Sequence, residues 1–100
     1  YPQTANVTMS AADILVKLSE DGIVYFKHYT SEQSVMTAAG LKAGGDAFPQ
    51  SSGVEGTINL MNLEPNTLYH AYFAIEDNAG NLNPNVVSLS FETSAYGYGN

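Results

Sequence analysis

Apolar and polar residues alternate along most of this chain with the two-residue period that is typical of β-strands. The clearest example is segment 67–77, which follows a proline and ends in an Asp/Asn/Gly turn at 77–81. One face of this segment carries the apolar side chains of Tyr69, Ala71, Phe73 and Ile75. We therefore predict a central strand over 67–77, against which the rest of the chain packs.

Other segments show a similar pattern, and we predict strands over 5–10, 13–19, 23–30, 55–63 and 85–93, with a short edge strand within 46–53. The side chains predicted to face the core are Ile14, Val16, Leu18, Ile58, Leu60, Leu63, Val87, Leu89 and Phe91. Pro49 limits the edge strand because it has no backbone N–H. The sequence Glu20-Asp21-Gly22 predicts a hairpin turn in which Gly22 adopts a positive φ.

Residues 31–45 interrupt the alternation. Residues 36–43 are mostly small, Thr37 is a suitable N-cap, and Gly44-Gly45 follows, which predicts a short helical insert. About seven strands at roughly ten-residue spacing, with no helix long enough for a crossover, predict an all-β, immunoglobulin-like antiparallel sandwich. We expect one domain over 1–93 and a Gly/Tyr-rich tail or linker over 94–100.

Charge and composition exclude some classes of binding partner. The chain has 3 basic and 10 acidic residues, a net charge of −7, and no cysteine. Without a basic stripe, nucleic acid and anionic membranes are poor partners, and no apolar run is long enough for membrane insertion. The start at Tyr1-Pro2 lacks a basic-then-apolar leader, so we expect an excised domain or a processed product.

The segment that holds Leu63, Pro65 and Tyr69 resembles the tyrosine corner of fibronectin type III domains. The resemblance implies that the Tyr69 hydroxyl closes this corner by a hydrogen bond to backbone upstream, and we expect a carbonyl as its partner. Segments 22–26, 37–44 and 76–81 are similar to motifs of modules in bacterial surface and secreted multidomain proteins. This resemblance implies an extracellular or cell-surface, non-catalytic accessory module whose partners are flanking domains, with no catalytic residues to carry over.

The sequence offers little for catalysis or for a cofactor. His28 and His70 are expected on the outer face of one sheet, where surface exposure is favoured over metal binding because Glu76 lies too far along the strand. There is no Gly-x-Ser-x-Gly motif and no phosphate-binding glycine loop. We therefore expect no enzyme and no cofactor. Segment 77–85 is rich in Asp and Asn, which favours Asx turns over calcium binding.

The outer face of the central sheet is the candidate partner-contact patch, with Val24, Phe26, His28, His70 and Tyr72 as its residues. Lys27 and Tyr29 are then expected to point toward the core. The alternative is that the insert 31–45 folds back over this patch. As a function, a spacer or protein-contact domain is favoured. The alternatives are a carbohydrate-binding module that uses Tyr72, Phe26 or the tail tyrosines Tyr96 and Tyr98, and an adhesin repeat stiffened by calcium.

Overall fold

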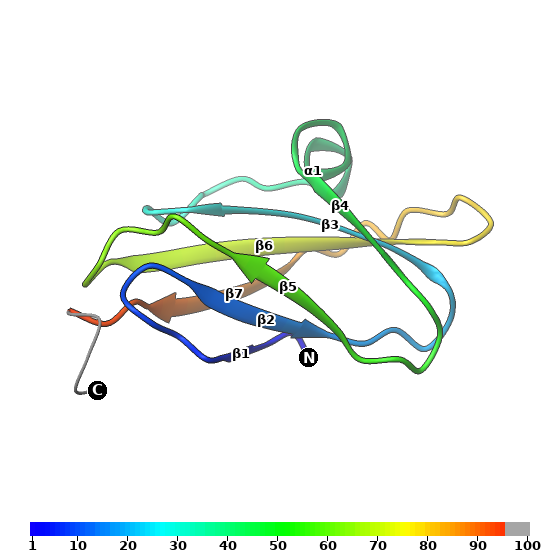
Figure 1. The fold of residues 1–100 in the computed structure, drawn as a ribbon. Helices are drawn as coiled ribbons and strands as arrows, with labels where there is room; N and C mark the ends of the chain where they lie inside the picture. The colour runs from blue at the N-terminus through cyan, green and yellow to red at the C-terminus, as the bar shows by residue number, and fades with distance from the viewer. Residues whose placement is uncertain (96–100) are drawn as a thin grey trace.

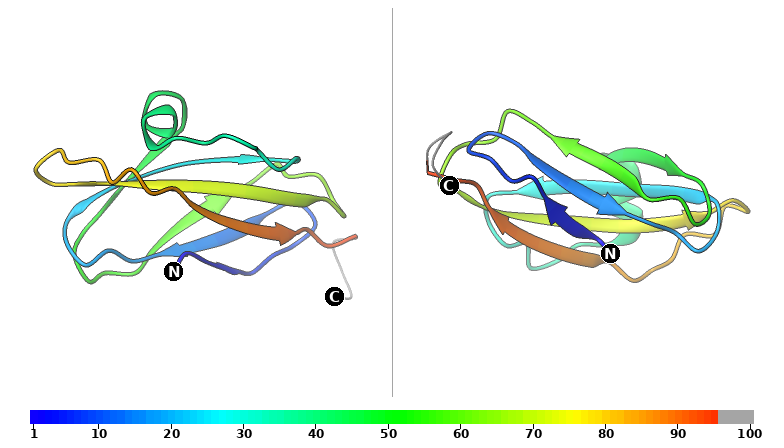
Figure 2. Two further views of the ribbon diagram at one scale, coloured as in Figure 1. Left: turned by 180° about the vertical axis from the view of Figure 1, so that it is seen from behind. Right: turned by 60° about the horizontal axis from the view of Figure 1, so that its bottom comes forward.

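The computed structural model describes residues 1–95, in which seven strands and one short helix follow one another along the chain (Figure 1). The elements are β1 (Gln3–Ala5), β2 (Ala12–Val16), β3 (Gly22–Tyr29), α1 (Ala38–Gly44), β4 (Asp46–Gln50), β5 (Gly56–Leu60), β6 (Leu68–Asp77) and β7 (Val87–Glu92). β1, β2 and β5 lie in one layer of a sandwich and β3, β4, β6 and β7 in the other, as the two views of Figure 2 show.

The strands form two antiparallel sheets, one with the order β1-β2-β5 and the other with the order β4-β3-β6-β7. The apolar core lies between them. Its buried residues are Ala12, Ile14, Val16, Leu18, Val24, Ile58, Leu60, Leu63, Tyr69, Ala71, Phe73 and Phe91. The prediction of an all-β antiparallel sandwich with a short helix is confirmed.

The central strand is β6, as predicted. It pairs with β3 on one side and β7 on the other, and Tyr69, Ala71 and Phe73 on its inner face are at most 4% exposed. The prediction for β7 is only partly right. Phe91 is buried and Leu89 packs against the core, but Val87 is 41% exposed because it lies at the edge of the sandwich.

The first predicted strand is displaced. β1 covers Gln3–Ala5 and not 5–10, because Asn6 adopts a left-handed conformation with φ 50°. Beyond it the Thr8 hydroxyl accepts hydrogen bonds from the N–H groups of Ser10 and Ala11. This local turn occupies backbone groups that a strand would use.

The predicted hairpin at Glu20-Asp21-Gly22 is wrong. β2 pairs with β1 and β5, whereas Gly22 begins β3 in the other sheet and pairs with Asp77 of β6. The connection therefore crosses from one sheet to the other. Glycine is required here by close approach, because a Cβ on Gly22 would lie 2.4 Å from the carbonyl oxygen of Glu76.

The helical insert and the edge strand lie where the sequence predicts them. The Thr37 side chain accepts a 3.0 Å hydrogen bond from the N–H of Gly40 and caps α1, as predicted. β4 lies at the edge of the four-stranded sheet and contains Pro49. Figure 1 shows α1 on the outside of that sheet, over β3.

Candidate functional site

The side chains of β3 face the opposite way from the prediction. Val24 is buried in the core of the sandwich, and Phe26 packs there with its ring stacked 6.5 Å from that of Phe73. His28 is half-buried on the same side, and its ring meets the edge of Tyr69 at 5.7 Å. Val24, Phe26 and His28 are therefore not part of an outer patch. The pairing of β3 with β6 sets this register.

The outer face of β3 carries Tyr25, Lys27 and Tyr29 instead. Lys27 is exposed and does not point toward the core, and its ammonium lies 5.7 Å from the centre of the Tyr29 ring. The two histidines lie on opposite faces of the sheet, since Tyr29, not His28, is the register partner of His70. The Nδ1 atom of His70 is 3.0 Å from the Ser90 hydroxyl. The predicted neighbourhood of His28 and His70 is wrong.

The insert covers the outer face of the sheet. Ala38 and Leu41 of α1 are buried against Tyr25, Tyr72 and Ala74, and Tyr72 is only 6% exposed. Partly buried apolar residues surround this second cluster: Ile23, Tyr29, Met36, Leu82 and Val86. The alternative that 31–45 folds back over the patch therefore describes the structure, with Tyr25 in the place expected for Val24 and Phe26.

A buried carboxylate anchors the insert to the sheet. Glu76 on the outer face of β6 is 7% exposed; its Oε1 accepts a 3.0 Å hydrogen bond from the Tyr25 hydroxyl, and its Oε2 pairs with the ammonium of Lys42. The contact with Lys42 lowers the pKa of Glu76 and raises the pKa of Lys42. In addition, the Tyr72 hydroxyl accepts a 2.8 Å hydrogen bond from the N–H of Gln33.

The sequence carries one signal for this contact. Glu76 is an acidic residue on the face of the central strand that also carries Tyr72 and Ala74, and a buried carboxylate needs a counter-charge. Lys42 is the cation of the insert. Pairing the two would have placed α1 over β6.

The predicted tyrosine corner is formed, with one difference. The Tyr69 hydroxyl accepts a 2.7 Å hydrogen bond from the backbone N–H of Glu64, where a carbonyl partner was expected. Leu63 is 6% exposed in the core, and the Pro65 carbonyl accepts a 2.8 Å hydrogen bond from the Thr67 hydroxyl. The corner thus holds the connection that leads from β5 into β6.

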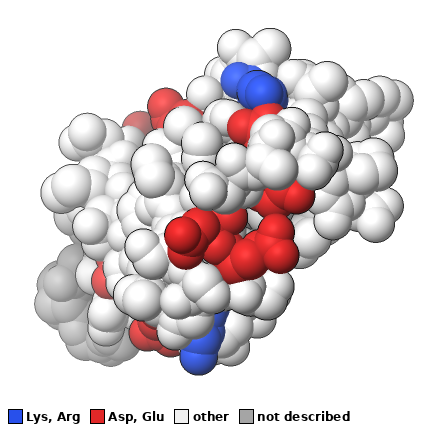
Figure 3. Space-filling view, turned by 90° about the vertical axis from the view of Figure 1, so that its right-hand side faces the viewer, with Lys and Arg blue, Asp and Glu red and all other residues white. Residues whose placement is uncertain are grey.

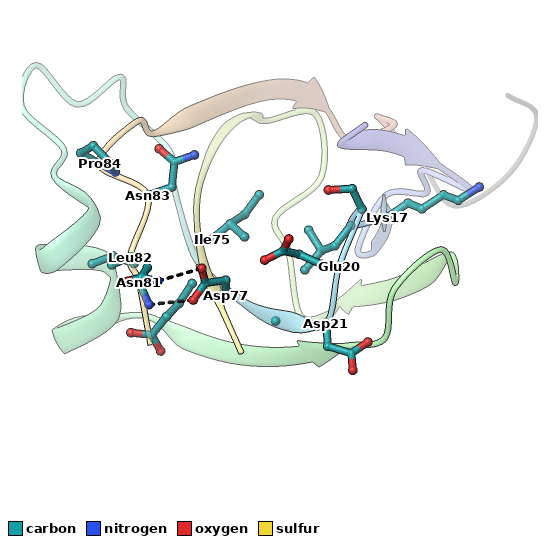
Figure 4. A pocket seen from close by; sticks show the side chains of 13 residues that line it. Lys17, Glu20, Asp21, Ile75, Asp77, Asn81, Leu82, Asn83 and Pro84 are labelled. Atoms are coloured by element: carbon teal, nitrogen blue, oxygen red, sulfur yellow. Dashed lines mark hydrogen bonds between the residues drawn. The ribbon is translucent and has the colours of Figure 1, made fainter. Parts of the chain in front are cut away.

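Acidic side chains gather at the end of the sandwich where the β2–β3 and β6–β7 connections lie (Figure 3). They border a cleft of about 700 Å³, with Glu20 on one side and Asn83 on the other (Figure 4). Asp77 is held within its own turn: its carboxylate accepts hydrogen bonds from the N–H groups of Ala79 and Asn81 and from the Asn81 side chain. Those hydrogen bonds lower the pKa of Asp77. This is the predicted Asx-turn chemistry.

Two further predictions concern metal ions and membranes. Among residues 1–95, no three histidine, aspartate or glutamate side chains are grouped so that they could hold a metal ion. In the same part of the chain no helix has the length and apolar character to cross a membrane. The tail tyrosines Tyr96 and Tyr98 lie outside the described residues.

Comparison with known proteins supports the fold. No protein-family model and no curated protein matches the chain. A solved structure described as a computer-based redesign of a β-sandwich protein is similar, with a TM-score of 0.54 and 20% sequence identity over 93% of this chain and 89% of that chain. At this identity the likeness shows the β-sandwich fold alone.

Proposed function

We propose that this chain is a fibronectin type III-like, non-catalytic accessory module of a larger extracellular or cell-surface protein, where it acts as a spacer or protein-contact domain. The observation that carries the proposal is the corner in which the Tyr69 hydroxyl accepts from the N–H of Glu64. A tyrosine at this point of a two-sheet sandwich, bonded to backbone a few residues upstream, is the corner known from such modules. Their common use as repeated structural units is the basis for the spacer role.

The strand order agrees with this choice within the sandwich folds. In constant-type immunoglobulin domains the fourth strand pairs with the fifth. Here β4 pairs with β3 and leaves β5 at the edge of a three-stranded sheet. This favours a relative of immunoglobulin domains over an immunoglobulin domain itself.

The shape also suits a spacer. The chain is elongated, with extents of 45 × 30 × 17 Å. Tyr1 donates a 2.5 Å hydrogen bond to Glu55 just before β5, whereas Ser94 contacts Asn66, beyond the far end of that strand. The two ends of the described chain leave the sandwich at different points along its length (Figure 1). Ends that leave at different points along the length are compatible with a row of joined modules.

The carbohydrate-binding alternative loses the part of its aromatic platform that was expected on the sheet, whereas the tail tyrosines Tyr96 and Tyr98 lie outside the described residues. Phe26 packs in the core, and Tyr72 lies under the insert at 6% exposure. The calcium alternative gains no support either, because the Asp77 carboxylate already accepts hydrogen bonds from its own turn. Neither alternative is therefore favoured by a specific contact.

The coding sequence around this segment tests the proposal. We expect the reading frame to continue beyond residues 1–100 and to encode further modules, with a second Leu-x-Pro-x-Thr-x-Tyr corner among them. Protease treatment of intact cells should release fragments that contain this module. A reading frame that encodes these residues alone, or a parent protein that resists the protease until the cells are lysed, would overturn the proposal.

A further inference from the structure

Residues 30–45 form a long connection between β3 and β4, which pair as a hairpin. β3 ends at Tyr29 and β4 begins at Asp46, whose register partner is Phe26 of β3. The backbone bonds that close α1 are internal, from Leu41 to Thr37 and from Gly45 to Leu41. In the described part of the chain, the sheet ladders are therefore complete without this segment. We call residues 30–45 the cover.

The cover has little stability of its own. α1 is only seven residues long and contains Gly40 and Gly44, and glycine favours the helical conformation less than alanine does. An isolated helix of this length does not persist in water. Only Ala38 and Leu41 of α1 are buried, whereas Val35 is 78% exposed. The contacts with the sheet must hold the cover in place.

One of these contacts is an ion pair. Lys42 lies in the last turn of α1, where a cation interacts favourably with the helix dipole, and its side chain is 48% exposed. Its partner Glu76 has a side chain only 9% exposed and belongs to the central strand. A half-exposed cation on a buried carboxylate joins the cover to the rigid sheet, and both groups regain water when the cover lifts.

We propose that the cover opens as a unit, hinged at Thr30 and Gly45, while the sandwich stays folded, and that the Lys42–Glu76 ion pair is its latch. Opening uncovers Tyr25, Tyr72 and Ala74 on the outer sheet face. This proposal goes beyond the accessory function and does not depend on it.

The charges around the latch set the direction of its pH response. Glu76 faces Lys42 from α1 and Tyr25 from β3, and Asp77 follows it on β6. The contact with Lys42 places the pKa of Glu76 below its usual value, so the latch holds above the ordinary carboxyl range and is lost as pH falls through the lowered pKa. The raised pKa of Lys42 keeps the latch closed until strongly alkaline pH.

Hydrogen exchange followed by mass spectrometry on the full chain tests the proposal. In the unaltered protein, amides of 39–45 should exchange faster than those of β3 and β6, and independently of them. Replacing Lys42→Met keeps the alkyl chain and removes the charge; exchange in 39–45 should then rise about tenfold, while β3 and β6 are unchanged. Gly44→Ala, which has no atom within 4 Å of the added methyl, should slow the same amides about threefold.

Lys17→Met is the matched control. Lys17 is an exposed cation that also lines the acidic cleft, but it follows β2 of the three-stranded sheet. It should leave exchange in 39–45 unchanged. If 39–45 exchange only together with β3 and β6, the cover is not a separate unit and the proposal fails. If the cover opens separately but Lys42→Met has no more effect than Lys17→Met, the latch assignment is wrong.

Discussion

The Tyr69 hydroxyl accepts a 2.7 Å hydrogen bond from the backbone N–H of Glu64, and this contact closes the corner between β5 and β6. The ring that carries the hydroxyl is 4% exposed and stacks 5.6 Å from Phe91 of β7. One side chain thus joins a loop, the central strand and an edge strand. Its apolar ring contributes to the core, while its polar tip satisfies a backbone donor.

Tyr69→Phe should lower the free energy of unfolding by about 1 kcal/mol, because the N–H of Glu64 loses its partner while the ring stays in place. Urea denaturation followed by circular dichroism measures this difference. Tyr29→Phe is the control, since within residues 1–95 the Tyr29 hydroxyl makes no hydrogen bond to protein. Equal effects of the two substitutions would show that the corner bond contributes nothing.

The corner and β6 could be predicted because their signals are local. Turn residues on both sides limit β6, and its inner face is consistently apolar. β3 contains the run Ile23-Val24-Tyr25-Phe26, which is apolar on both faces, so alternation could not show which face is inward. Only the pairing with β6 places Val24 and Phe26 beside the inner-face residues Ile75 and Phe73.

The prediction of the partner-contact patch failed for the same reason. Both faces of β3 are apolar because both are covered, one by the three-stranded sheet and the other by α1. The alternation of apolar and polar residues could indicate the cover but not its position over β6; only the charges of Lys42 and Glu76 offered a signal for that position. The need for glycine at position 22 was equally hidden, since the backbone that approaches it belongs to Glu76, 54 residues away.

Gly22→Ala should destabilise the protein by roughly 1–3 kcal/mol, because the new methyl group would lie 2.4 Å from the Glu76 carbonyl oxygen. β3 and β6 would have to separate at this point. Thermal melting compares this variant with Gly44→Ala, whose methyl group enters open space and should be neutral or stabilising. A Gly22→Ala variant as stable as the unaltered protein would mean that the two strands do not approach this closely.

Phe73→Ala should cost roughly 3–5 kcal/mol, because it leaves a cavity in the centre of the core. Phe73 is 2% exposed and stacks on Phe26 across the β3–β6 pair. Leu68→Ala on the same strand serves as control, since Leu68 is 48% exposed and should change stability by less than about 0.5 kcal/mol. Chemical denaturation measures the free energy of unfolding of both variants. The loss should be large for the inner-face residue Phe73 and small for Leu68.

Chelation should leave the melting temperature unchanged. The oxygens of Asp77 accept hydrogen bonds from Ala79 and Asn81, so the turn is closed by the chain itself. Differential scanning calorimetry in the presence of a chelator, and after addition of excess calcium, measures this. A midpoint that falls with chelator and recovers with calcium would favour the calcium-stiffened adhesin repeat.

His28 should make the protein less stable as pH falls from 7 to 5. Burial lowers the pKa of His28 below its usual value, against the opposing charge of Asp46. The unfolded chain, with a histidine pKa near 6.5, then binds the proton more readily than the folded chain. The contribution of His28 is therefore present above about pH 6.5 and is lost as pH falls through the lowered pKa.

His28→Gln should remove this part of the pH dependence, and urea midpoints measured between pH 7 and pH 5 provide the test. His70→Gln is the matched control because His70 lies on the opposite face of the sheet and contacts Ser90. It should retain the decline seen in the unaltered protein. If His70→Gln flattens the profile and His28→Gln does not, the inward orientation of His28 in β3 is contradicted, because the desolvated histidine would then be the one on β6.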